Sequence, residues 1–336
     1  MENPSPPDLM NRLITGYWST QAIYVAAKLG LADQLREGPR TVDQLASKAG
    51  VHAPSLYRLL RALASLGVFA ETAPHTFALT PLAECLRSDL PGSQRALAIM
   101  SGEEHYTAWG ELLYSVQTGK TAFDKIYGMP VFEFLSKHEE QAKTFDAAMV
   151  GVHGRESAAM VEAYDFSRFG VLADIGGGNG SLLMTVLQKH PALKGMLYDL
   201  PGVVQRASAA LAAAGMADRC QVVGGSFFES VPAGADAYLM RHIIHDWDDE
   251  KALTILQNTH RAMRGDGTLL VIEGVIPPGN DPDFGKLLDL TMLTIPGGKE
   301  RTEAEFRALF AAGGFELTRI IPTTAGVSVL EGKKRT

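Results

Sequence analysis

The first candidate site is a glycine-rich run that follows an apolar segment. The run reads Asp174-Ile175-Gly176-Gly177-Gly178-Asn179-Gly180, and Asp199 lies 21 residues beyond Gly178. Glycines let a backbone approach a ligand closely. A carboxylate at the end of the following strand is placed to accept hydrogen bonds from two ribose hydroxyls. The spacing therefore predicts a site for a ligand that contains a nucleoside.

Asp174 distinguishes between two classes of ligand that contain a nucleoside. Gly176 and Gly178 fit the dinucleotide fingerprint G-x-G-x-x-G/A, but its third position is occupied by Ser181. A carboxylate directly before the glycines repels a pyrophosphate and attracts a cation. S-adenosylmethionine carries an ammonium and a sulfonium and no phosphate. We therefore predict that S-adenosylmethionine, rather than a nicotinamide cofactor, binds at this loop.

The second candidate site is the run Arg241-His242-Ile243-Ile244-His245-Asp246-Trp247-Asp248, which follows a short apolar segment. His245 is the candidate general base, because an unperturbed histidine has a pKa of about 6.5. The alternative is a structural histidine with satisfied hydrogen bonds. His242 and His245 could instead bind a metal, but a third ligand is needed, and Asp246 is adjacent in sequence and poorly placed. The run therefore favours a base that works without a metal.

Alternating strands and helices position both runs. From Val171 onward, apolar strand patterns alternate with helical ones, which is typical of a doubly wound sheet that binds ligands at the carboxyl ends of its strands. The last two strands lack a long helix between them and are expected to form an antiparallel pair at the sheet edge. The predicted fold class is α/β, with a Rossmann-like sheet of seven strands. The strands are expected over 171–175, 196–200, 221–223, 237–240, 268–276, 316–322 and 327–330, and the helices over 181–190, 203–214, 249–264 and 303–312.

The N-terminal part has a different pattern. Thr41 is a predicted N-cap for a helix over 42–48, a second helix begins near Pro54, and a short hairpin spans 68–79. Together they form a winged helix, which either binds DNA or mediates dimerisation. The first 95 residues hold nine Lys and Arg against eight Asp and Glu, whereas phosphate contact needs a clustered positive face. We predict a winged-helix dimerisation domain over 9–101.

The composition fits two domains. The chain has 336 residues, of which 46% are hydrophobic, a formal net charge of −7, and two cysteines, Cys85 and Cys220. This balance argues against nucleic acid as a partner, and so few cysteines indicate a reducing compartment. The N-terminus shows no signal-peptide pattern, and no apolar stretch reaches the ~18 residues of a membrane span. We expect a cytoplasmic protein in which residues 102–336 bind S-adenosylmethionine and residues 102–165 form a helical substrate-pocket segment.

These motifs together resemble a known family. The glycine-rich run, Asp199, the triplet His245-Asp246-Trp247 and the late run Gly297-Gly298-Lys299-Glu300-Arg301-Thr302 are similar to those of class I S-adenosylmethionine-dependent O-methyltransferases of the caffeic-acid and acetylserotonin type. Bacterial antibiotic-tailoring members are similar as well, and the resemblance covers nearly the whole chain. It implies a homodimer that methylates a hydroxyl of a small aromatic or polyketide-like molecule in antibiotic or other secondary metabolism.

The resemblance also implies roles for single residues. His245 matches the family's general base, and Glu273 and Glu300 match the two carboxylates that flank it. Ser226 stands where the family usually has an aspartate for adenine, and Arg241 where plant members have a lysine. The expected cofactor-binding residues are Asp174, Gly176, Gly178, Asp199, Gly225, Ser226, Phe227 and Arg241, and the matched substrate-pocket residues are Phe145, Met149, Met292 and Ile295.

The expected reaction is an in-line displacement in which His245 takes the proton of a phenolic or enolic hydroxyl. Two alternatives use the same cofactor site. One is a tailoring enzyme that hydroxylates, decarboxylates or cyclises its substrate, and the other is a winged-helix regulator that senses S-adenosylmethionine. Such non-methylating relatives often lose the base or its partners, which this chain keeps, and the recognition helix carries only Arg58 and Arg61 as basic residues. Methyl transfer is therefore favoured.

Replacing Asp199 tests the placement of the cofactor. We predict that Asp199→Ala binds S-adenosylmethionine or its demethylated product clearly more weakly than the wild type, because the variant loses the carboxylate that accepts the ribose hydroxyls. Titration calorimetry of both proteins measures the two affinities. Equal affinities would refute this placement.

Overall fold

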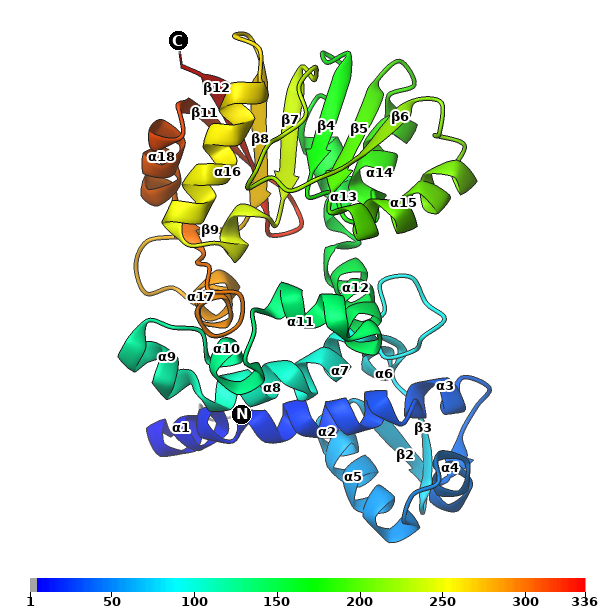
Figure 1. Cartoon of the computed structure of the whole chain (residues 1–336). Helices are drawn as coiled ribbons and strands as arrows, with labels where there is room; N and C mark the ends of the chain where they lie inside the picture. Colours follow the sequence, from blue (N-terminus) through cyan, green and yellow to red (C-terminus); the bar gives the residue numbers. More distant parts are fainter. Residues whose placement is uncertain (1–4, 336) are drawn as a thin grey trace. The chain divides into compact units, whose positions relative to one another are not determined.

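The computed structural model describes residues 5–335 of the chain. The chain divides into two compact units, of which the N-terminal unit comprises Met1–Gly110 and Phe132–Gly154, and the C-terminal unit Glu111–Val131 and Arg155–Thr336 (Figure 1). The segment 102–165, expected to be part of the C-terminal domain, is thus shared between both units. Its last helix in the N-terminal unit, α12, packs against α7 there.

The N-terminal unit contains the winged helix that the sequence predicts. Thr41 caps the first of its two helices with a complete capping box, in which its hydroxyl accepts the Gln44 N–H and the Gln44 side chain accepts the Thr41 N–H. Leu45, Leu60 and Phe77 are fully buried between these elements. The helices of the unit are α1 (Pro6–Ile14), α2 (Gly16–Lys28), α3 (Leu31–Leu35), α4 (Val42–Ala49), α5 (Ala53–Ser65), α6 (Pro81–Glu84), α7 (Arg95–Gly102), α8 (Glu104–Gly110), α11 (Val131–Lys137) and α12 (Glu139–His153), and its sheet has the order β1 (Arg40–Thr41), β3 (Thr76–Leu79), β2 (Phe69–Ala73).

The C-terminal unit is built on one sheet of seven strands, as predicted. Five of them are parallel, and the last two of the chain form the antiparallel pair at one edge. The strand order is β11 (Phe315–Pro322), β12 (Ser328–Lys334), β8 (Thr268–Glu273), β7 (Ala237–Arg241), β4 (Val171–Ile175), β5 (Lys194–Asp199), β6 (Cys220–Gly224). The other elements are α9 (Leu112–Thr118), α10 (Ala122–Tyr127), α13 (Glu156–Ala163), α14 (Ser181–Lys189), α15 (Pro201–Ala213), the 3-10 turn η1 (Ile244–Asp246), α16 (Asp249–Ala262), β9 (Val275–Ile276), α17 (Phe284–Thr294), β10 (Arg301–Thr302) and α18 (Glu303–Ala312).

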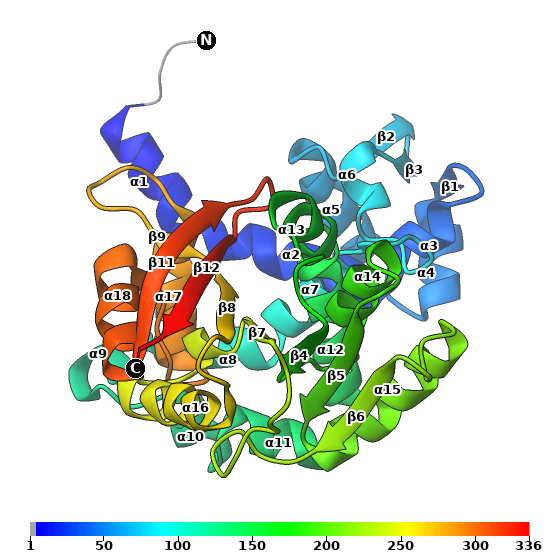
Figure 2. The same ribbon diagram turned by 90° about the horizontal axis from the view of Figure 1, so that it is seen from above.

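Helices cover both faces of this sheet, which makes it doubly wound (Figure 2). Successive strand residues point to opposite faces. Leu172 and Leu270 pack beneath α13, α14 and α15, whereas their neighbours Ala173 and Val271 pack beneath α16 and α18. All four are fully buried. Because both faces are covered, polar groups of the parallel strands reach a ligand only from the strand ends.

One predicted strand and one helix differ from the structure. The strand expected over 268–276 ends at Glu273, and after Gly274 the chain leaves the large sheet to pair as β9 with β10. Helix α17 was not predicted. Its N-cap is Asp283, whose carboxylate accepts the Gly285 N–H. Because β8 ends at Glu273 rather than at Ile276, this carboxylate lies at the carboxyl end of its strand, where a parallel sheet binds ligands.

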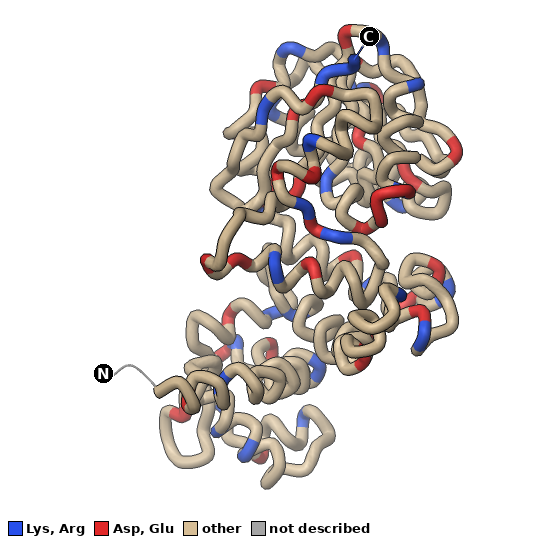
Figure 3. The backbone as a smooth tube through the Cα atoms, turned by 90° about the vertical axis from the view of Figure 1, so that its left-hand side faces the viewer, with Lys and Arg blue, Asp and Glu red and all other residues tan. Residues whose placement is uncertain are grey.

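Basic and acidic residues are interspersed along the described part of the chain. Figure 3 shows basic and acidic residues interleaved along the chain of both units. Among the described residues, no helix combines the length and the apolar character that crossing a membrane would require.

Candidate active site

The glycine-rich run forms a tight loop between β4 and α14. Gly176 and Gly178 have φ values of +71° and +57°, which L residues rarely adopt. A Cβ atom on Gly176 would lie 2.4 Å from Ile243 Cδ1. The Gly176 N–H donates to the Tyr198 carbonyl at 2.8 Å, which ties the loop to β5. The backbone conformation therefore favours glycine at both positions, and at Gly176 a larger residue would also displace the Ile243 side chain.

Asp199 lies directly beside this loop. Its Oδ2 accepts the Gly178 N–H at 2.9 Å, and its Oδ1 accepts the Leu200 N–H at 2.6 Å. The Gly225 N–H donates to the Asp199 carbonyl at 3.0 Å, so the segment after β6 joins the same site. The structure thus brings together the ends of β4 and β5, which sequence spacing had linked, and the end of β6, which only the family resemblance had added.

Asp174 is a buried carboxylate with unused hydrogen-bonding capacity. It is 2% exposed, and its Oδ2 accepts no hydrogen bond from the described part of the chain. Burial raises the pKa of Asp174 to about 7, against the opposing charge of Arg241 and with the repulsion of Asp199. An adjacent cation would favour the ionised form. This carboxylate fits a ligand that carries an ammonium group.

The remaining predicted cofactor residues border the same strand ends. Ser226 accepts the Phe228 N–H at 3.3 Å through its hydroxyl, and the Phe227 ring lies 6.1 Å from the Trp247 ring. Arg241 donates to the Ser157 hydroxyl at 3.0 Å. These contacts place a neutral hydroxyl, an aromatic surface and a cation around the loop.

His245 lies on η1, directly after β7, and is held from two sides. Its Nδ1 lies 2.6 Å from Glu300 Oε1, and its backbone N–H donates to Glu273 Oε1 at 3.0 Å. His245, Glu273 and Glu300 are 8%, 0% and 3% exposed. The family resemblance implies these three residues as a base with two flanking carboxylates, and the fold brings them together from η1, the end of β8 and the segment before β10. An ionised Glu300 fixes the proton of the neutral imidazole on Nδ1 and leaves Nε2 to accept another.

The acidic surroundings control the protonation of this histidine. Burial alone lowers the pKa of His245, but the carboxylates of Asp246, Glu300 and Glu273 outweigh it and raise the pKa above its usual range. Burial also raises the pKa of Glu273 and of Asp246, while the imidazole opposes both shifts. The cluster therefore binds protons more readily than its separate groups would.

Sequence analysis missed several contacts of this centre. Asp246 Oδ1 lies 3.5 Å from His245 Nε2, whereas sequence analysis assigned Asp246 no role beside the base and only a place in the family triplet and a rejected one as a metal ligand. His242 has a φ of +53° and lies 3.0 Å from Glu156 on α13, a contact that no local motif indicates. Arg301 was known only as part of the late run, and its complete burial shows that it faces inward.

Two of the predicted substrate-pocket residues lie on α12, and the other two lie on α17 or directly after it. Phe145 and Met149 are half-buried on α12 in the N-terminal unit. Met292 on α17 and Ile295 directly after it are 8% and 3% exposed in the C-terminal unit. Their role in substrate binding stays a prediction.

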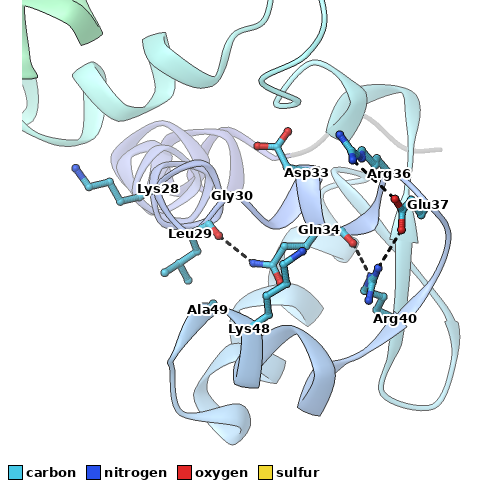
Figure 4. A pocket seen from close by; sticks show the side chains of 10 residues that line it. All are labelled: Lys28, Leu29, Gly30, Asp33, Gln34, Arg36, Glu37, Arg40, Lys48 and Ala49. Carbon is cyan, nitrogen blue, oxygen red and sulfur yellow. Dashed lines mark hydrogen bonds and ion pairs between the residues drawn. The ribbon is translucent and has the colours of Figure 1, made fainter.

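A hollow in the N-terminal unit contains none of the predicted site residues (Figure 4). Glu37 pairs there with Arg36 and Arg40, and the Arg40 guanidinium also donates to the Gln34 carbonyl at 2.7 Å. Glu37 is 69% exposed, and exposed ion pairs of this kind contribute little. We assign no ligand to this hollow.

Two family models match the chain. Residues 109–316 match the O-methyltransferase domain, and residues 11–89 match the O-methyltransferase dimerisation domain. The first match covers more than half of the chain and includes the glycine loop, His245, Glu273 and Glu300.

Individual relatives agree with these matches. The phenazine O-methyltransferase PhzM of Lysobacter antibioticus is 49% identical over 97% of this chain and 95% of its own. A crystal structure titled LaPhzM superposes with a TM-score of 0.95 at 48% identity, covering 98% of this chain and 100% of that one. Human N-acetylserotonin methyltransferase, solved in complex with S-adenosylmethionine, gives a TM-score of 0.90 at 26% identity, covering 100% and 99%. A relative of different activity, the aclacinomycin 10-hydroxylase RdmB of Streptomyces purpurascens, is 36% identical over 92% of this chain and 84% of its own.

The contact between His245 and Glu300 makes a prediction that needs no enzyme assay. In Glu300→Gln the imidazolium loses a charged partner, so the pKa of His245 falls. NMR titration of the histidine ring nitrogens, with the signal assigned by its absence in His245→Asn, measures this pKa. Glu305→Gln, five residues along the chain, is the matched control and should leave it unchanged. An unaltered pKa in Glu300→Gln would contradict the proposed contact.

Proposed function

This chain belongs to the O-methyltransferase family, and from that premise we propose that it transfers a methyl group from S-adenosylmethionine to a phenolic or enolic hydroxyl of a small aromatic molecule. The observation that carries this proposal is the buried contact of 2.6 Å between His245 and Glu300, at the same end of the sheet as the glycine loop. A base is needed there because a hydroxyl must lose its proton when it is methylated.

The loop and its carboxylates would hold the cofactor. S-adenosylmethionine supplies the methyl group as an electrophile on a sulfonium and leaves as S-adenosylhomocysteine. Asp174 would pair with the cationic amino-acid end, because its buried Oδ2 has no partner within the described chain. Asp199 would accept the ribose hydroxyls, and the segment Gly225-Ser226-Phe227 would border adenine. Ser226 offers adenine a neutral partner in place of the family's usual aspartate.

His245 would act as the general base through Nε2. Glu300 accepts the Nδ1 proton, which orients the ring and stabilises the imidazolium that forms, as the acid does in a serine-protease triad. The acceptor oxygen gives its proton to Nε2 as it takes the methyl group. The proton later leaves to solvent, which restores the neutral base.

The acidic cluster reduces the cost of this proton transfer. Between a histidine of ordinary pKa and a phenol, full transfer costs about 5 kcal/mol. The carboxylates around His245 raise its pKa and so reduce the difference between this pKa and that of a phenol. The same shift keeps more of the imidazole protonated, so the neutral base predominates only above the usual histidine range.

The acceptor class follows from the predicted pocket and from the relatives. Phe145, Met149, Met292 and Ile295 are apolar, and they suit a flat aromatic molecule. The similar phenazine enzyme is named for an aromatic substrate of this kind.

The 10-hydroxylase relative makes non-methylating chemistry the second candidate. The complete set of His245, Glu273 and Glu300 favours methyl transfer, because a hydroxyl acceptor requires a base at this position. The mass of the product distinguishes the two reactions, since exchange of a hydrogen for a methyl group adds about 14 mass units, the increment of one CH₂. A product without this increment, formed from a phenol panel with labelled cofactor, would favour the second candidate.

The base makes the first functional prediction. His245→Ala should lose about 10²- to 10⁴-fold in kcat while it still binds S-adenosylmethionine, because removal of a general base has this effect and the loop is untouched. His245→Asn should fail similarly, since an amide cannot accept the proton usefully. His260→Ala, on α16, is the control and should keep wild-type turnover. Normal turnover by His245→Ala would show that another group is the base.

The same assay tests metal dependence. We expect EDTA to leave the wild-type rate unchanged, because Nδ1 of His245 is already engaged by Glu300 and the candidate base needs no metal to accept a proton. Loss of activity in EDTA that returns with a divalent cation would overturn this part of the mechanism.

We also propose a homodimer built mainly by residues 9–100. None of the residues of α1 is buried, although its side chains Leu9, Met10, Leu13 and Ile14 are apolar and 49–70% exposed. Such a face is typical of an interface. Light scattering should give twice the mass of 36.2 kDa, and Leu13→Asp on α1 should lower the measured mass. A monomer at micromolar concentration would refute the dimer.

A further inference from the structure

Arg301 is the most deeply buried cation of the C-terminal unit among the described residues, with 0% exposure. Its guanidinium donates to the carbonyls of Ile244 at 3.1 Å and Trp247 at 3.0 Å. These two residues lie on either side of His245. It also donates to Asp249 Oδ1 at 2.8 Å, at the start of α16. One side chain therefore holds both ends of the turn that carries the candidate base.

The backbone around Arg301 holds the same turn from the other side. The Lys299 N–H donates to the His245 carbonyl at 2.9 Å, and the Arg301 guanidinium also donates to the Lys299 carbonyl at 3.3 Å. A Cβ atom on Gly298 would lie 1.9 Å from the His245 carbonyl oxygen, so only glycine permits this approach. The strip 298–301 and the turn 244–247 thus lie against each other, with Glu300 between Lys299 and Arg301.

The charge of Arg301 is not explained by stability alone. A buried cation loses its hydration, and its one carboxylate partner, Asp249, is 62% exposed. Well-packed apolar residues often replace buried charges without loss of stability. A guanidinium, however, presents several donors in a rigid fork, which suits carbonyls on different residues. The arrangement fixes positions rather than simply filling space.

We infer that Arg301 is a positioning residue for the base: it fixes the turn of His245 against the strip that carries Glu300 and so maintains the contact between them. The hydrogen bonds of Arg301 go to Asp249 and to backbone carbonyls rather than to the His245 ring, so it would act through the contact between His245 and Glu300. The inference rests on the proposed role of His245. A displacement of about 1 Å at a reacting group can cost on the order of 10²-fold in rate.

A double-mutant cycle tests this inference. Arg301→Lys keeps the positive charge but loses the planar set of hydrogen-bond donors of the guanidinium. We expect this variant to lower kcat about tenfold to a hundredfold. Its affinity for S-adenosylmethionine should stay within about twofold, because the loop residues lie on other strands. Glu300→Gln combined with Arg301→Lys should be little slower than Glu300→Gln alone, since both changes break one contact. Losses that multiply in the double variant would overturn the inference.

A second readout excludes a general loss of stability. The pKa of His245 in Arg301→Lys, measured by NMR, should fall in the same direction as in Glu300→Gln, whereas a merely structural change would leave it at the wild-type value. Arg307→Lys, a half-exposed arginine on α18, is the matched control for both readouts. An Arg301→Lys protein with wild-type kcat and wild-type His245 pKa would refute the role.

Two further variants keep the test decisive. If Arg301→Lys does not fold, Asp249→Asn can be used instead, because it removes the carboxylate partner of Arg301 at the surface. This variant should lower kcat less than Arg301→Lys would, and its effect should again be non-additive with that of Glu300→Gln. Multiplying losses would overturn the inference here too. If His245→Ala turns over normally, the proposed function fails, whereas normal turnover by Arg301→Lys alone refutes only the present inference.

Discussion

The burial of one imidazole among carboxylates is the constraint on which the candidate site depends. His245 and Glu300 meet at 2.6 Å while almost no surface of either is exposed. Taking such charges out of water is costly unless each is paired and hydrogen-bonded. The partners come from two separate segments: Glu273 lies at the end of β8, and Glu300 and Arg301 lie next to each other in the strip 298–301, which leads into β10. The break after β8 belongs to the same arrangement, because β9 pairs with β10 and brings the strip back toward the large sheet.

Parallel strand order explains why two chemical groups meet at one edge. In the order β8, β7, β4, β5, β6, every strand ends on the same side, and helices cover both faces. Glu273, Arg241, Asp174, Asp199 and Gly225 are near or directly after the ends of these five strands in turn. The carboxylate proposed to pair with the cofactor and the proposed base thus lie at the same sheet edge without any local sequence signal that links them. The fold supplies the proximity, and the loops supply the chemistry.

Patterns of short range were predictable from the sequence, and contacts of long range were not. The strand over 171–175, the N-cap at Thr41 and the antiparallel edge pair follow from apolar spacing, capping residues and the lack of a connecting helix. Glu300 lies in a glycine-rich segment whose local pattern resembles a solvated loop, and only family resemblance indicated its role. Arg301 and the pair of His242 with Glu156 had no signal, because burial depends on segments that lie 52 to 86 residues away. Helix α17 was not predicted, because Gly285 is its second residue and Pro- and Gly-rich segments, 277–279 and 296–298, flank it on both sides and resemble loops.

The pKa values of Asp174 and His245 are both raised, but by different causes and with different consequences for charge. Asp174 is a carboxylate whose pKa is raised by burial, more than the charge of Arg241 lowers it, so arrival of a further cation would favour its ionised form and release a proton. His245 is a buried base whose pKa is raised because carboxylates surround it, so it favours gaining a proton. Arg301 lies next to Glu300 and lowers the pKa of Glu273, which opposes the effect of burial on that carboxylate. A cation that holds the turn in place therefore also keeps negative charge near the imidazole. Removal of its positive charge would disturb both the geometry of the base and the field that makes it basic.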